Sequence, residues 1–472
     1  MELTLSHWLY GIFTLLIIIT MMFRKGVVLP TLLGTFFIAL VYKGSLVDGF
    51  TAIFNANLVA AQELFNIFLI ITFMIALLHS LNDLGADQRM IQPIQKMMVN
   101  GHLAFFILVI ITYTISLFFW PTPAVPLICA LLVPAAVRAG LPAISAAVAI
   151  ALAGQGMALS SDYVVQVAPS LSAKAGGLEV SAVADQALIL SLIVGFVAIL
   201  GAYLFHRKTI RLKGDKQNEV ELQSLRTAER TVNKATATHL PIWSKVFAIF
   251  VPLALVTVVA YMMYTKLISG RMGGLEGGDG AALIGGVAVI LLLLATIAFG
   301  KQHALDYISN HITDGFVFAF KAMGPVIPIA GFFFLGSPDF SGRILGVDEG
   351  PALLFDLIQS MQGFLPQDAL FVGFSVLLVG MITGLDGSGF SGLPLTGALA
   401  ATMGTSTISS ETLAAIGQMG AIWAGGGTLV AWSSLIAIAG FCGVSVMELV
   451  RKNFLPVVLG LFIATVIAVY LF

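Results

Sequence analysis

The sequence predicts an all-α polytopic membrane protein with about ten transmembrane helices and two re-entrant hairpins, arranged as two inverted repeats with broken helices. Three observations lead to this prediction. Of the 472 residues, 58% are hydrophobic and 10% are charged, whereas a soluble domain is about 45–50% apolar and about 25% charged. Apolar runs long enough to cross a bilayer recur along the whole chain. The 48 glycines and 17 prolines indicate that several of these runs are interrupted.

The scarcity and balance of charge exclude several classes of function. A formal net charge of −1 offers no basic surface for nucleic acid. The two cysteines, Cys129 and Cys442, lie in apolar segments without a third ligand nearby, so we expect core residues and neither a disulfide framework nor a metal site. The Walker A and His-Glu-x-x-His patterns are absent, and no cofactor is expected.

The predicted spans start close to the N-terminus. Residues 1–7 carry no basic region, so we expect the first apolar run, 8–23, to be a retained transmembrane helix and not a cleavable signal peptide. The other apolar segments are, in chain order, 27–43, 61–81, 103–119, 124–138, 142–172, 183–206, 242–265, 281–299, 316–336, 368–385, 390–403, 411–441 and 453–472.

Two places in this series look like hairpins and not like pairs of full crossings. The second arms, 124–138 and 390–403, are short for a span, and the connections before them are too apolar and too brief to be ordinary loops. We therefore predict re-entrant hairpins at 103–138 and 368–403.

Two other segments are unusually long. Residues 142–172 and 411–441 each span 31 residues and contain a glycine cluster, at 154–156 and 425–427. Each is predicted to be one helix that is broken at its glycines.

Basic residues orient the predicted spans, because Lys and Arg concentrate on the cytoplasmic side. The polar segment 207–240 contains eight basic and four acidic residues, so we place it in the cytoplasm. Tracing the crossings from there puts 18 of the 23 basic residues inside and the other five outside. Both termini are then external, in a membrane that we expect to be a bacterial inner membrane.

The hairpin and the broken helix occur twice, in the same order. Residues 1–206 form the first predicted repeat, 207–240 a cytoplasmic linker and 241–472 the second repeat. The second hairpin arms align as Pro-Leu-x-x-Ala-Leu, starting at Pro126 and at Pro394. Each repeat has five crossings, an odd number, so the two repeats must have opposite orientations. Inverted repeats with broken helices near the midplane are typical of secondary transporters.

The two hairpin tips carry the residues on which a family resemblance depends. The first arm continues from its tip as Leu-Ile-Cys-Ala-Leu-Leu-Val up to Pro134. The tips are Phe119-Trp120-Pro121-Thr122-Pro123-Ala124-Val125-Pro126 and Gly384-Leu385-Asp386-Gly387-Ser388-Gly389-Phe390-Ser391-Gly392-Leu393-Pro394.

With these tips, the arrangement resembles the ion transporter superfamily, which includes divalent-anion/sodium symporters, gluconate and citrate permeases, and the membrane subunits of TRAP transporters. The Ser-Asn-Thr triplet of the sodium–dicarboxylate branch is absent from both tips. The resemblance implies an elevator-type carrier that works as a homodimer.

Acidic residues at predicted membrane depth are candidates for the coupling ion, Na⁺ or H⁺. Asp386 and Gly387 lie in the second tip, and Ser161 and Asp162 follow the first glycine cluster. A structural alternative exists for each acid: Asp386 would cap the following helix, and Asp162 would simply be wet at the outer mouth.

Hydroxyl groups and glycines near the breaks are candidates for the substrate. Serines in such turns can also serve only to satisfy backbone groups, and this alternative stays open. The predicted substrate-binding residues are Thr122, Pro123, Ser160, Ser388, Gly389, Ser391 and Thr428.

Together these features predict a secondary transporter of a small organic anion, a carboxylate, coupled to Na⁺ or H⁺. A cation/proton antiporter on the same scaffold is the alternative, because no cationic side chain is evident at membrane depth. Gly389-Phe390-Ser391-Gly392 fits a rhomboid-protease pattern, but no histidine follows Ser391 to act as its base, so an enzyme is not expected.

Overall fold

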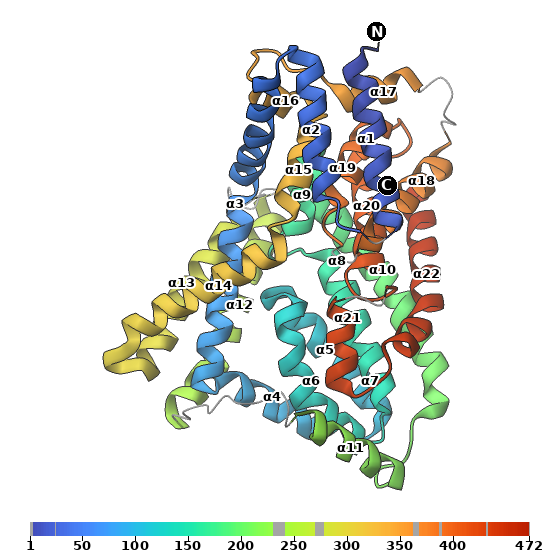
Figure 1. Ribbon diagram of the computed structural model, residues 1–472. Coiled ribbons are helices and arrows are strands. Elements are labelled where there is room, and N and C mark those ends of the chain that lie inside the picture. The colour runs from blue at the N-terminus through green and yellow to red at the C-terminus, as the bar shows by residue number, and fades with distance from the viewer. Residues whose placement is uncertain are drawn as a thin grey trace.

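The computed structural model describes residues 3–23, 25–229, 241–269, 278–361, 368–386, 389–430 and 433–471. Helices account for 85% of the structure, and the described residues contain no strand (Figure 1). The predicted all-α class is therefore confirmed.

Several helices are suited to a membrane by their length and composition. Within the described residues, six are long and apolar enough to cross it, or up to seven if the bent α3 counts as one span. The count of ten crossings, the re-entrant hairpins and the inverted repeats stay predictions. The six are Gly101–Phe119, Ala143–Ser161, Val180–Thr209, Ile242–Met262, Ala282–Lys321 and Val446–Leu471, and the bent pair is Leu46–Asn66 with Phe68–Leu84.

One group of helices, here called the framework, comes from the first part of each half of the chain. Its long helix α3 packs against α2, α13, α14 and α15, and Phe68 of α3 lies 4.8 Å from Phe320 of α14 between ring centroids. The framework comprises α1 (Leu5–Met22), α2 (Val28–Lys43), α3 (Leu46–Leu84), α4 (Ala86–Met97), α12 (Pro241–Ser269), α13 (Gly278–Gly300), η3 (Lys301–His303), α14 (Ala304–Met323), α15 (Val326–Leu335), α16 (Pro338–Leu345) and α17 (Leu353–Met361).

The other helices form a second group, here called the central bundle, on the right of Figure 1. Its contacts include those of α18 with α20, α10 with α22, α9 with α19 and α6 with α21. The bundle comprises α5 (Gly101–Phe119), α6 (Pro121–Arg138), α7 (Ala143–Ile150), η1 (Ala151–Ala158), α8 (Leu159–Ser161), α9 (Val167–Gly176), α10 (Val180–His206), α18 (Ala369–Thr383), η5 (Gly384–Asp386), α19 (Leu393–Met403), α20 (Ser410–Gly425), α21 (Ser433–Cys442) and α22 (Val446–Leu471).

Local capping explains where several helices begin and end. The side chains of Ser45 and Asn100 accept hydrogen bonds from amides in the first turns of α3 and α5, and Asp368 does the same for α18. Such caps satisfy amides that have no partner inside the helix. Gly44 and Gly85 end α2 and α3 in the left-handed region that favours glycine.

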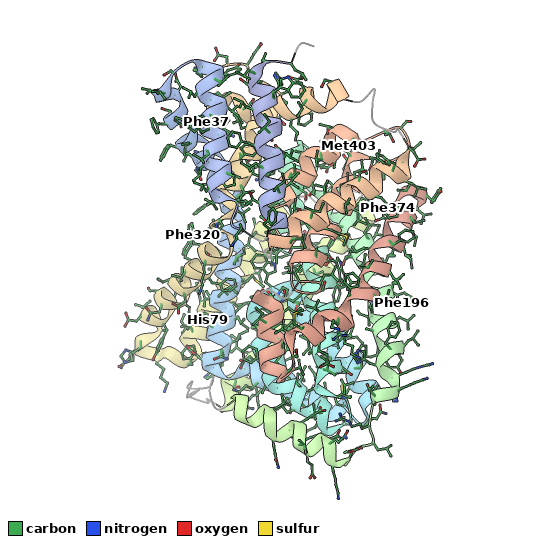
Figure 2. The ribbon with its side chains drawn as sticks, turned by 45° about the vertical axis from the view of Figure 1, so that its right-hand side comes forward. Phe37, His79, Phe196, Phe320, Phe374 and Met403 are labelled. Carbon is green, nitrogen blue, oxygen red and sulfur yellow. The ribbon has the colours of Figure 1, made fainter. Side chains whose placement is uncertain are left out.

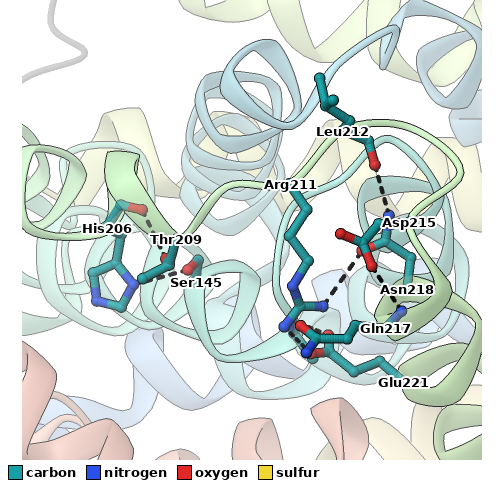
Figure 3. A network of polar contacts seen from close by, with 10 residues as sticks. Ser145, His206, Thr209, Arg211, Leu212, Asp215, Gln217, Asn218 and Glu221 are labelled. Carbon is teal, nitrogen blue, oxygen red and sulfur yellow. Dashed lines mark hydrogen bonds and ion pairs between the residues drawn. The ribbon is translucent and has the colours of Figure 1, made fainter.

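The described part of the predicted linker, residues 207–229, contains two helices. After η2 (Arg207–Thr209), α11 (Lys216–Glu229) packs against α6 and α21 at the bottom of the view in Figure 1. Figure 3 shows the polar network that holds this region together. In it, the Arg211 guanidinium donates to Glu221 at 2.7 Å, and the other oxygen of Glu221 accepts from the backbone N–H of Ala143 at 2.9 Å. Residues 210–221 are therefore attached to the bundle.

Some predicted boundaries are wrong, for identifiable reasons. The span predicted at 61–81 belongs to a helix that begins at Leu46, and the first turns of that helix contain Asp48 and polar positions. The predicted break at Gly154-Gln155-Gly156 does not occur, because the chain continues there as the π-helix η1 and leaves the helix only after Ser161. The second glycine cluster does end its helix, at Gly425.

Three helices and the beginning of a fourth were not predicted from the apolar runs of the sequence. The helix α4 and the beginning of α14 are amphipathic, and α16 and α17 are too short to resemble spans. The arm predicted to start at 124 begins at Pro121, because proline at the first helical position is favourable.

The contact between α9 and α19 depends on two small residues. A Cβ at Gly397 would overlap the carbonyl oxygen of Ser172, and one at Gly176 would lie 2.6 Å from the carbonyl oxygen of Gly397. Gly397→Ala should therefore force the two helices apart and destabilise the fold by about 1–3 kcal/mol. The measurement is the melting temperature of the detergent-solubilised protein.

Gly440→Ala in α21 is the matched control, because nothing lies within 4 Å of its Cβ position. Equal melting temperatures for the two variants would contradict the proposed packing constraint.

Candidate functional site

Four interruptions of helical structure among the described residues define the candidate site: Trp120 between α5 and α6, residues 162–166, residues 389–392, and residues 426–430. Trp120 adopts a φ of +60°, which is uncommon for a residue with a side chain. Its ring lies 5.3 Å from that of Phe390 in the second tip. The two predicted hairpin tips therefore meet, although they lie 270 residues apart in the sequence.

The second tip also packs on the interruption at residues 426–430. Gly389 adopts a φ of +72°, and a Cβ there would lie 3.0 Å from the backbone nitrogen of Gly426. This predicted site residue therefore lies where only glycine fits easily. Ser391 is buried in the same tip.

Two helix N-termini from opposite halves of the chain converge. The hydroxyl oxygens of Thr122 in α6 and Ser434 in α21 lie 3.3 Å apart. A helix N-terminus combines free N–H groups with the positive end of the helix dipole, so it favours anions. Pro121 has no N–H, which leaves the amide and hydroxyl of Thr122 as polar groups at the start of α6.

The π-helix η1 lies beside these N-termini. A Cβ at Gly154 would lie 3.3 Å from the Ser116 hydroxyl oxygen and 3.4 Å from Cβ of Pro121. On the other side, a Cβ at Gly427 would lie 3.1 Å from Cβ of Ser434 and 3.4 Å from Cβ of Gln155. Gln155 therefore lies beside the N-terminus of α21. Single π turns inside α-helices are frequent at functional sites.

Gln155 is the most unusual polar residue of this region. Its side chain is fully buried, and neither its amide nitrogen nor its amide oxygen has a hydrogen-bond partner among the described residues. The Ser116 hydroxyl, also buried, is unpaired within the same set. Buried polar groups are nearly always hydrogen-bonded, so these two require an explanation, and a bound ligand is one.

Asp162 has a structural role in the interruption at residues 162–166. It is 4% exposed, and its carboxylate accepts a 2.7 Å hydrogen bond from the backbone N–H of Ala168 in the first turn of α9. The alternative of a solvated residue at the outer mouth is therefore wrong, because Asp162 is buried and caps α9.

The other polar residues near the breaks mainly satisfy backbone groups. The hydroxyls of Ser160 and Ser161 donate to the carbonyls of Met157 and Ala158, and Thr428 donates to the carbonyl of Trp423. In addition, Gln418 donates to the carbonyl of Ser160 at 2.8 Å, and Asn453 donates to that of Thr428 at 3.1 Å. The structure thus gives Ser160, Ser161 and Thr428 local partners.

The structure brings only part of the predicted site together. Thr122 and Gly389 lie at the meeting point of the tips and breaks, whereas Gly387 and Ser388 lie outside the described residues, as do the side chains of Pro123 and Asp386. Sequence reasoning did not select Gln155, Ser434 or Ser116. The only signal for Gln155 was its place between two glycines in an apolar run.

Comparison with known proteins identifies a relative along the whole chain. The sequence is 36% identical over 467 residues to a Bacillus subtilis (strain 168) protein named "Uncharacterized membrane protein YhfA", covering 98% of this chain and 97% of the relative. The chain belongs to the YhfA family. No protein-family model matches it. Membership in this family and the apolar helices together establish an integral membrane protein.

The capping role of Asp162 in this YhfA-family chain can be tested by two substitutions. Asp162→Ala should lower stability by about 0.5–2 kcal/mol, because the amides at the start of α9 lose their acceptor. Asp162→Asn should cost less, because the amide oxygen can still accept from Ala168. Melting temperatures of the detergent-solubilised variants measure the difference. Equal losses in the two variants would show that the charge matters more than the cap.

Proposed function

We propose that this protein is a secondary active transporter of a small organic anion, a carboxylate, coupled to Na⁺ or H⁺. The observation that carries the proposal is the convergence of the N-termini of α6 and α21 at Thr122 and Ser434, beside the Gln155 amide, which has no partner in the described part of the chain. Hydroxyl groups, an amide and two positive helix ends at membrane depth are suited to an anion.

The pattern of helix packing favours the inverted repeat on which this mechanism depends. Suppose that the helices of α1–α10 correspond in order to those of α12–α22, so that α6 corresponds to α19 and α9 to α21. The contact of α9 with α19 then has its counterpart in that of α6 with α21. Likewise, the contact of α4 with α12 has its counterpart in that of α17 with α1, and the contact of α4 with α6 in that of α17 with α19. The helices α10 and α22 correspond to each other, and they are in contact. We therefore propose that the central bundle moves against the framework as in an elevator, in a homodimer.

A coupling cation would find oxygen ligands at the same place. Hard cations such as Na⁺ bind carbonyl, hydroxyl and carboxylate oxygens. The backbone carbonyls freed at 426–430 and the Gln155 amide oxygen are such groups, and Asp386 and Gly387 of the second tip stay candidates from the sequence. The second candidate function, a cation/proton antiporter, is favoured by the buried carboxylate of Asp162.

Uptake by purified protein in liposomes tests the proposal. We expect a labelled carboxylate from a panel to accumulate only when a Na⁺ or H⁺ gradient is imposed. Gln155→Leu should reduce this uptake at least about tenfold without lowering the melting temperature, because the buried amide has no partner to lose among the residues that the structure describes.

Thr465→Val is the matched control, because Thr465 is a buried hydroxyl of α22 that donates only within its own helix. Normal uptake by Gln155→Leu would remove Gln155 from the site. Dissipation of a cation gradient without any organic substrate would favour the antiporter instead.

The proposed location is the bacterial inner membrane, with α11 in the cytoplasm and both termini external. The start of α1 and the end of α22 lie in the upper half of Figure 1, and α11 lies at its bottom. In a variant carrying Cys129→Ser and Cys442→Ser, Lys213→Cys should react with a membrane-impermeant maleimide only after the cells are opened. Val47→Cys, which is 73% exposed at the other end, should react in intact cells. The reverse pattern would invert the topology.

A further inference from the structure

A cluster of three charges links the central bundle to the framework. Glu63 lies on α3, Lys174 on α9 and Arg343 on α16. One carboxylate oxygen of Glu63 lies 2.9 Å from the Arg343 guanidinium, and the other lies 3.5 Å from the Lys174 ammonium. Lys174 also donates to the backbone carbonyl of Glu63. Glu63 is thus shared by two cations on different helices.

The two cations belong to different parts of the molecule. Arg343 lies on α16, which packs against α3 within the framework, and it also donates to Gln62 at 2.8 Å. Lys174 lies on α9, a helix of the central bundle. Arg343 therefore fixes the Glu63 carboxylate inside one group of helices, whereas Lys174 reaches it from the other group.

The surroundings of α9 show that this is a contact zone between the two groups. The end of α9 lies beside α16, because a Cβ at Gly177 would lie 2.8 Å from a carboxylate oxygen of Asp339. The helix α9 also packs against α15 of the framework, whereas its counterpart α21 packs mainly on α6, α7, α11 and α22, outside the framework. The ion pair thus lies at a contact with the framework that α9 makes and its counterpart α21, among the described residues, does not, as expected of an inverted repeat observed in one of two states.

We propose that the Lys174–Glu63 ion pair is a latch that favours the described position of the central bundle against the framework. The inference rests on the proposed function, because it requires a bundle that moves. The pair breaks whenever α9 leaves α3, whereas the Arg343–Glu63 pair persists in both positions. The side chains of Lys174 and Glu63 are 27% and 26% exposed, so water screens their attraction only in part.

The test compares the two cations directly. Spin labels replace Phe37 of α2 and Phe196 of α10, which lie on opposite sides of the molecule in Figure 2, in a variant carrying Cys129→Ser and Cys442→Ser. Distance distributions between the labels are measured in liposomes without substrate. Lys174→Gln should change the ratio of the two populations about two- to fivefold, the scale of a partly exposed ion pair. Arg343→Gln, the matched control, removes a pair within the framework and should leave the ratio unchanged.

A second comparison isolates the pair. Glu63→Gln should have the same effect as Lys174→Gln, and the double variant should exceed neither, because all three lack the same ion pair. Identical distributions in the parent, Lys174→Gln and Arg343→Gln proteins would overturn the latch, and so would equal shifts in the last two. The distance measurements need no substrate, so they test the latch independently of uptake. Failure of all carboxylate uptake would refute the proposed function alone.

Discussion

The structure depends on one constraint: a chain that leaves the helix at membrane depth must satisfy its freed backbone groups from within. An unpaired N–H or C=O in hydrocarbon costs several kcal/mol, roughly the stability of a small domain. The carboxylate of Asp162 accepts from the start of α9, and Gln418 and Asn453 donate to carbonyls at the two breaks. These buried polar side chains permit a polar site inside an otherwise apolar bundle.

Against this background, Gln155 is unusual because both atoms of its side-chain amide lack a partner among the described residues. Gln418 and Asn453 each find a backbone partner, whereas Gln155 finds none among the described residues although it is equally buried. A buried amide without partners is expected at a functional site, where a ligand or ion completes the hydrogen bonding. The same reasoning separates Gln155 from Ser160, Ser161 and Thr428, whose hydroxyls have local partners.

The sequence predicts the class of the fold and most helices correctly, because both follow from apolar composition and period. It does not locate the first break, because Gly154-Gln155-Gly156 allows a break but also allows the close packing of a π-helix on its neighbours. Nor does it identify α4, α16 and α17, because these helices are short and amphipathic and therefore lack the long apolar run of a membrane span. The site was only partly predictable, since the meeting of Thr122 with Ser434 joins residues 312 positions apart.

The interleaving of the two halves has a consequence for the synthesis of the protein. The helix α6 packs against α21, and α19 packs against α9, so each half of the chain supplies the packing partner for a predicted hairpin arm of the other. The thiols of Cys129 and Cys442 lie 3.9 Å apart across the first of these contacts, 313 residues apart in the chain. While the ribosome is still translating the second half, α6 has no α21 to pack against. The helix α6 must therefore remain without its final partner until almost the whole chain has been made.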